Sequence, residues 1–104
     1  MAEALKRITG KATITGTSII TVPTGSTFTV IGLRGSNNDT TAHHWVHFEI
    51  NGNLVCGAET PLPVGSAIDV MEGSKIVAQA DDVITAYSDA DNVVDVYISY
   101  LEQS

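Results

Sequence analysis

The sequence has few of the residues that mark a disulfide-bonded or membrane-spanning protein. It contains one cysteine, Cys56, in 104 residues, so no disulfide can form within the chain. It has no run of about 18 apolar residues, the length that a membrane-spanning helix needs. Its start lacks the apolar stretch of a secretory signal. We therefore expect one domain that matures in a reducing compartment or does not depend on oxidation, does not cross a membrane and carries no secretory signal.

Catalytic motifs are also missing. The chain contains no Gly-x-Ser-x-Gly nucleophile turn and no phosphate-binding loop. Cys56 has no basic residue beside it in the sequence, so we interpret it as a buried, inert thiol. These absences predict a non-enzymatic protein without a cofactor.

Positive charge is scarce and unevenly distributed. Five basic residues face twelve acidic ones, for a net charge of −7, but residues 1–35 carry a net +3 and residues 36–104 a net −10. The acidic body argues against nucleic acid as a partner, because phosphates require a basic surface. The basic first third could contact an acidic partner or could be a solvated strand edge. Its four basic residues, which we take as the candidate contact, are Lys6, Arg7, Lys11 and Arg34.

Short segments of alternating apolar and polar residues, separated by turn residues, make up most of the chain. No segment has a convincing helical period, and the Asn51-Gly52 pair favours a type I′ hairpin turn. We expect an N-terminal arm over residues 1–10 and one all-β domain over residues 11–104, an antiparallel sandwich of jelly-roll type with about eight or nine short strands. The expected strands are Lys11–Thr15, Ser18–Val22, Thr27–Arg34, His43–Ile50, Asn53–Cys56, Ala67–Met71, Lys75–Ala78, Asp82–Ser88 and Val93–Leu101. Residues 35–41 are expected to form a loop, 57–65 an irregular crossover and Glu72-Gly73 a turn.

Two of these segments indicate which face points to the core. In Val93–Leu101 the residues Val94, Val96, Ile98 and Tyr100 should point inward, and Asp95, Tyr97 and Ser99 outward. In His43–Ile50 the mostly apolar set is His44, Val46, Phe48 and Ile50, which leaves His43, Trp45, His47 and Glu49 on the outer face. Because tryptophan is enriched where proteins bury against one another, we interpret this outer face as a subunit or partner interface. The alternative is the opposite register, in which Trp45 belongs to the core.

Neither the histidines nor the acidic residues predict a metal site. His43 and His47 share a face but lie about 13 Å apart along a strand, too far to bind one ion within a chain, although a ring of copies around a symmetry axis could. The acidic group is Asp81, Asp82, Asp89, Asp91 and Asp95. Residues 89–92 resemble half a calcium loop but lack its glycine and bidentate glutamate. Turn capping is the favoured interpretation, with a structural cation as the alternative.

Several turn and strand patterns resemble those of small β-sandwich virion proteins of tailed bacteriophages and prophages, which include capsid decoration (cement) proteins and accessory proteins of the neck and tail. The resembling segments are 29–32, 54–57, 60–66, 72–73 with 76–77, 80–84 and 96–102. One departure is Ala80-Asp81-Asp82, where the family-like turn reads Ala-Gly-Asp.

The resemblance implies a non-enzymatic structural protein of the virion, assembled in the host cytoplasm. Its partners would be the major capsid protein or other virion proteins, and it would form a homotrimer. Capsid decoration is the favoured role, with a neck or tail accessory role next. The alternative class is a small carbohydrate- or surface-binding module, for which Trp45 beside the loop 35–41 would be the platform.

Overall fold

The computed structural model describes residues 3–55, 57, 59–71 and 75–103. These residues form a β-sandwich without helices, and therefore without a helix that could cross a membrane. Cys56 and the Glu72-Gly73 turn lie outside the described residues. The strands are β1 (Glu3–Lys11), β2 (Thr17–Thr21), β3 (Thr27–Asn37), β4 (His44–Ile50), β5 (Asn53–Leu54), β6 (Thr60–Leu62), β7 (Ala67–Asp69), β8 (Ile76–Ala78), β9 (Val83–Ser88) and β10 (Val94–Gln103).

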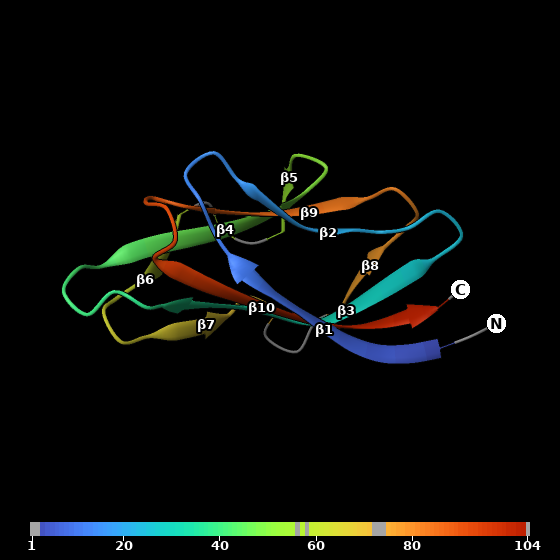
Figure 1. Cartoon of the computed structure of the whole chain (residues 1–104), viewed down its shortest axis with the longest axis horizontal. Coiled ribbons are helices and arrows are strands. Elements are labelled where there is room, and N and C mark those ends of the chain that lie inside the picture. Colours follow the sequence, from blue (N-terminus) through green and yellow to red (C-terminus); the bar gives the residue numbers. More distant parts are fainter. Residues whose placement is uncertain (1–2, 56, 58, 72–74, 104) are drawn as a thin grey trace.

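Two antiparallel sheets face each other. Sheet A has the order β1-β10-β3-β7, with β8 also paired to β3, and sheet B has the order β2-β9-β4-β5, with β6 also paired to β4. Figure 1 shows β1, β10 and β3 as one layer and β2, β9 and β4 as the other. Strands consecutive in the chain mostly alternate between the sheets, so most pairings join segments distant in the sequence.

The core lies between the sheets and takes alternate residues from each long strand. Val46 and Phe48 of β4 are fully buried, as are Val94 and Ile98 of β10, so the predicted inward faces of both strands are confirmed. The buried apolar residues are Ala12, Ile20, Val22, Phe28, Val30, Leu33, Val46, Phe48, Leu62, Met71, Ala78, Ile84, Ala86, Val94, Val96, Ile98 and Tyr100. The opposite register for Trp45 is wrong, because a slip of one residue would expose Val46 and Phe48.

The segment expected as an N-terminal arm is instead a strand. Residues 3–11 pair in continuous antiparallel register with β10, from Glu3 opposite Gln103 to Lys11 opposite Asp95. Because β1 covers one edge of β10 and β3 the other, β10 is a central strand of sheet A. The expectation of an arm failed because β1 pairs with residues about 90 positions away, which local sequence cannot reveal.

The largest other differences from expectation lie in three segments. The first expected strand, Lys11–Thr15, contributes only Lys11 to a strand, while β3 runs on through Asn37 into the expected loop. The crossover 57–65 contains β6, with Pro61 in it. Proline is tolerated there because, among the residues described, β6 pairs only with β4 and so lies at an edge of sheet B.

The Asn51-Gly52 hairpin forms as predicted. Asn51 and Gly52 have φ values of 50° and 85°, and positive values at both central positions define a type I′ turn. The turn joins β4 to the short β5. It also connects to the next turn along sheet B, because the Asn51 amide donates a 2.8 Å hydrogen bond to Asp82.

Candidate functional site

The outer face of sheet A gathers three of the four predicted basic residues. Arg7 and Lys11 of β1 lie opposite Ser99 and Asp95 of β10, and both of these β10 side chains point away from the core. Arg34 lies on the same face, across from Tyr97. Lys6 alternates to the other side of β1. The register therefore brings Arg34 onto the same face as residues of β1, although 23 or more positions separate them in the chain.

Two of the four basic residues are ion-paired within the chain. Lys6 Nζ lies 2.6 Å from Glu102, and this hydrogen bond raises the pKa of Lys6 and lowers that of Glu102. Lys11 pairs with Asp95, and its hydrogen bond lowers the pKa of that carboxyl. Within the described part of the chain, Arg7 and Arg34 form no ion pair. These two exposed guanidinium groups are available to a partner.

An apolar band crosses the same face at the end where β1 begins and β10 ends. Leu5 lies opposite Leu101, which lies opposite Thr29, which in turn lies opposite Val77 of β8. Leu5 is 71% exposed and Val77 59% exposed. Ile31 adds to the band because the register shifts between Ser99 and Tyr100, which leaves Ile31 as an extra, exposed residue of β3.

Beside this band the face is hollowed. The hollow has a volume of about 780 Å³. Small residues line its base: Gly32 packs so closely against Ser99 that a Cβ on Gly32 would stand 2.6 Å from Ser99 Oγ. Tyr97, 43% exposed, lies in the hollow between Thr9 and Arg34 of the neighbouring strands. The hollow is lined by two basic and two acidic residues, Lys11, Arg34, Asp69 and Asp95.

The outer face of sheet B holds an aromatic row. The ring of Trp45 stacks on that of His47, with centroids 5.2 Å apart and planes at 6°, and His47 in turn packs against Tyr87 of β9 at 4.8 Å. His47 Nε2 is 3.2 Å from Glu49, while its buried Nδ1 has no hydrogen-bond partner in the residues described. Trp45, His47 and Glu49 thus share one face as predicted, but stacking leaves Trp45 only partly exposed. The interface role of this face stays a prediction.

His43 stands apart from this row. It is an exposed residue just before β4, and its Nδ1 accepts a hydrogen bond of 3.0 Å from the backbone N–H of Val64. Among the described residues, no group of three histidine, cysteine or acidic side chains is placed to hold a metal ion.

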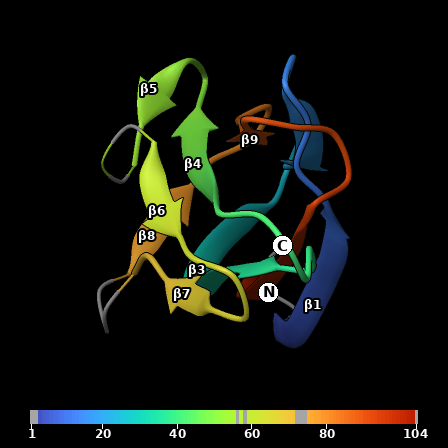
Figure 2. The same ribbon diagram turned by 90° about the vertical axis from the view of Figure 1, so that its left-hand side faces the viewer.

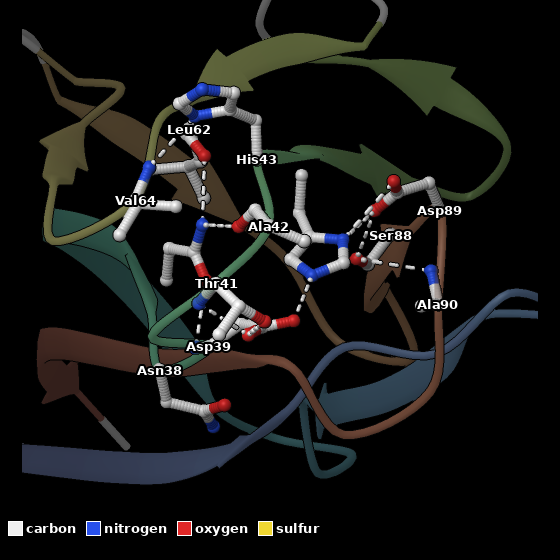
Figure 3. Close-up of polar contacts among 12 residues, drawn as sticks. Asn38, Asp39, Thr41, Ala42, His43, Leu62, Val64, Ser88, Asp89 and Ala90 are labelled. Carbon is white, nitrogen blue, oxygen red and sulfur yellow. Dashed lines mark hydrogen bonds and ion pairs between the residues drawn. The ribbon is translucent and has the colours of Figure 1, made fainter.

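His44 joins two connecting segments that the sequence did not relate. Its Nε2 is 2.9 Å from Asp39 of the loop before β4, and its Nδ1 is 2.9 Å from Asp89 after β9 (Figure 3). The hydrogen bond to Asp39 raises the pKa of His44; burial opposes this, and the bond to Asp89 reinforces it. An imidazolium that donates from both nitrogens, with only 9% of its side chain exposed, is a structural link between these segments.

The acidic group divides into separate turn contacts. Asp82 accepts from the N–H of Gln79 and from Asn51, Asp91 accepts from the N–H of Ile14, and Asp81 accepts from Thr24. The predicted turn-capping role therefore holds for Asp81, Asp82 and Asp91. Asp89 instead binds His44, and Asp95, within β10, pairs with Lys11.

Asn37, Tyr87 and Tyr97 are important residues that the sequence analysis did not single out. Asn37, nearly buried at the end of β3, donates to the carbonyls of Ala42 and Leu62 and thereby fixes the loop before β4 (Figure 3). The alternation of β10 placed Tyr97 on the outer face, but its neighbours follow from pairing register, which one sequence does not fix.

Comparison of the chain with protein-family models, with curated proteins and with solved structures found no match.

Proposed function

We propose that the protein is a non-enzymatic structural protein of a tailed-phage particle, a capsid decoration protein that binds and stabilises the assembled head. The proposal combines the resemblance in sequence with the sandwich fold. The strand orders β1-β10-β3-β7 and β2-β9-β4-β5 support the jelly-roll interpretation, because strands consecutive in the chain mostly alternate between two sheets. A neck or tail accessory protein is the nearest alternative role.

The observation that carries the proposal is the composition of the outer face of sheet A. Exposed Leu5, Ile31 and Val77 lie on this face together with Leu101 and Thr29. Arg7, two residues along β1 from Leu5, and Arg34, farther along the face opposite Tyr97, form no ion pair in the described residues. Contiguous exposed apolar side chains bordered by polar ones are typical of protein-binding surfaces. An acidic patch of the major capsid protein would complement the two arginines.

Stabilisation of the head would follow from mass action. A protein that binds only the assembled shell shifts the equilibrium toward that shell, and repeated copies on the lattice multiply the effect. The protein would assemble onto the virion in the host cytoplasm. The aromatic face of sheet B, formed by Trp45, His47, Glu49 and Tyr87, would join the copies into a homotrimer, because it lies on the sheet opposite to the capsid-binding face.

Co-sedimentation with expanded, empty capsids of the phage that encodes the chain tests the proposal. We expect Val77→Glu to weaken binding at least about tenfold, because it places a charge in the apolar band. Ile14→Glu is the matched control, since Ile14 is 58% exposed against 59% for Val77 but lies between β1 and β2. If both variants bind as tightly as the wild type, the outer face of sheet A is not the capsid-binding surface. No binding by the wild type would reject the function.

The second candidate is a carbohydrate-binding module, and the hollow around Tyr97 favours it. An exposed ring beside serine and threonine hydroxyls and balanced charges offers both stacking and hydrogen bonding to a neutral sugar. Tyr97 is a better platform than Trp45, one face of which His47 covers. Retarded migration in gels that contain xylan, starch or hydroxyethylcellulose, lost in Tyr97→Ala, would support this function over the first.

A further inference from the structure

Strand β1 presents a free edge. Within the part of the chain that the structure describes, β10 is the only strand that pairs with residues 3–11. Figures 1 and 2 place β1 at the margin of the sandwich. Its first five described residues, Glu3 to Arg7, are all exposed. An exposed strand edge carries unpaired N–H and C=O groups and is a template for another strand.

The side chains along this edge are self-complementary. Glu3, Leu5 and Arg7 point to the same side of β1, the outer face of sheet A, because side chains alternate along a strand. An acid and a base lie symmetrically about a leucine. If a second β1 runs antiparallel with Leu5 opposite Leu5, each Glu3 stands opposite the Arg7 of the other copy.

We propose that two copies of the chain associate by antiparallel pairing of their β1 strands, with the twofold axis at Leu5. Two Glu3–Arg7 ion pairs and one Leu5–Leu5 contact then lie on the outer face of the joined sheet. Directly opposed residues in an antiparallel pair have Cβ atoms about 4.5–5.5 Å apart, close enough for these contacts. The two A sheets become one, and the apolar band of each copy continues into the other through Leu5.

Neighbouring registers lack this complementarity. A shift by two residues in one direction places Lys6 opposite Lys6 and Leu5 opposite Arg7. The opposite shift places Glu3 opposite Leu5 and Ala4 opposite Ala4. A shift by one residue pairs odd-numbered with even-numbered positions, which disrupts the ladder of a symmetric pair. Only the register centred on Leu5 opposes unlike charges at both ends while keeping the apolar residues together.

This proposal stands on β1 and does not require a role in a virion. It also differs from the predicted trimer contact, which involves sheet B. If both contacts form, pairing of β1 doubles the mass of the assembly and the contact through the aromatic face triples it. Five paired residues per copy give a small interface, so association will be clearest at high protein concentration.

Sedimentation equilibrium over a range of concentrations tests the pairing with three variants. Arg7→Glu opposes two carboxylates at each end of the pair, and we expect it to weaken this association about tenfold. The double variant Glu3→Arg/Arg7→Glu restores unlike charges in reversed order and should recover the wild-type association. Arg34→Glu is the control, because it makes the same charge change on the same face away from the edge.

The outcomes are distinct. The pairing is supported if self-association is lost in Arg7→Glu, recovers in the double variant and is unchanged in Arg34→Glu. A mass unaffected by Arg7→Glu, a single-chain mass for the wild type at all concentrations, or a double variant as weak as Arg7→Glu overturns it. Circular dichroism of each variant confirms that the fold is retained. Capsid binding is measured separately, so failure of the pairing and failure of the proposed function are told apart.

Discussion

The imidazole of His44 and the carboxylate of Asp39 are joined by a hydrogen bond of 2.9 Å between Nε2 and Oδ2. The contact fixes the loop before β4 to the strand that follows it. The other ring nitrogen binds Asp89, so one buried side chain holds both connecting segments. His44 therefore does more for the fold than its position among the apolar residues of β4 suggests.

Replacement of His44 by alanine should lower the free energy of unfolding by about 1–3 kcal/mol, because hydrogen bonds to charged groups at a mostly buried side chain are lost. His43→Ala is the matched control. It removes one acceptor for the N–H of Val64 at an exposed position and should cost about 0.5–1 kcal/mol. Urea unfolding of the two variants measures both values. Equal losses would show that His44 is not the link we describe.

Stability should depend on pH through the same site. The pKa of His44 lies above its ordinary value of 6.5, so its contribution is complete below about pH 6.5 and lost as the pH rises through the raised value. The pKa of Asp39 is lowered by the bonds from His44 and Thr41. Burial raises that of Asp89, but bonds from His44 and the Trp45 N–H outweigh it. The contributions of Asp39 and Asp89 to stability are therefore complete above about pH 3.8 and are lost as the pH falls through their lowered pKa values.

Thermal unfolding between pH 3 and 9 checks this dependence. We expect the contribution of this site to be greatest between about pH 4 and 6.5, where His44 is charged and both carboxyls are ionised. The difference in melting temperature between the wild type and His44→Ala should therefore narrow toward pH 9. A difference that stays constant across the range would mean that charge on His44 contributes nothing.

The sequence predicted the parts of the fold that local alternation determines. The inward faces of β4 and β10 follow from a period of two, and the Asn51-Gly52 turn follows from the positive φ that asparagine and glycine tolerate. The prediction that Trp45 lies on the outer face was correct because it also follows from the period of two along β4. Its partial burial was not foreseen, because the packing of His47 against Tyr87 depends on the pairing of β4 with β9.

Contacts between distant segments could not be predicted. The strand β1 exists because it covers an edge of β10 across about 90 residues of sequence, and its own polar pattern gives little sign of this. The side-by-side placement of Tyr97 and Arg34, and of His44 and Asp89, depends on register in the same way. One sequence specifies which face a residue takes but not its neighbour across the ladder.

Gly16 should be among the least replaceable glycines. Its φ is +93°, and a Cβ there would stand 2.5 Å from Cε2 of Tyr87. Gly16→Ala should cost about 2–4 kcal/mol, from backbone strain and displacement of the Tyr87 ring. Gly25→Ala is the control, since its φ of +88° is equivalent but its Cβ would meet open space. Its cost should be about 1–2 kcal/mol. Chemical denaturation measures the free energy of unfolding of both variants. Equal losses would show that contact with the Tyr87 ring adds nothing to the cost of Gly16→Ala.

Trp45→Ala tests the predicted interface of sheet B. If this face joins three copies, light scattering should give one third of the wild-type mass for the variant, while circular dichroism shows that the core, which excludes Trp45, still forms. Tyr97→Ala is the matched aromatic control on the opposite sheet and should leave the mass unchanged. A Trp45→Ala variant with the wild-type mass would assign the tryptophan to the row that it forms with His47 and to no intersubunit contact. The trimer would then need another interface.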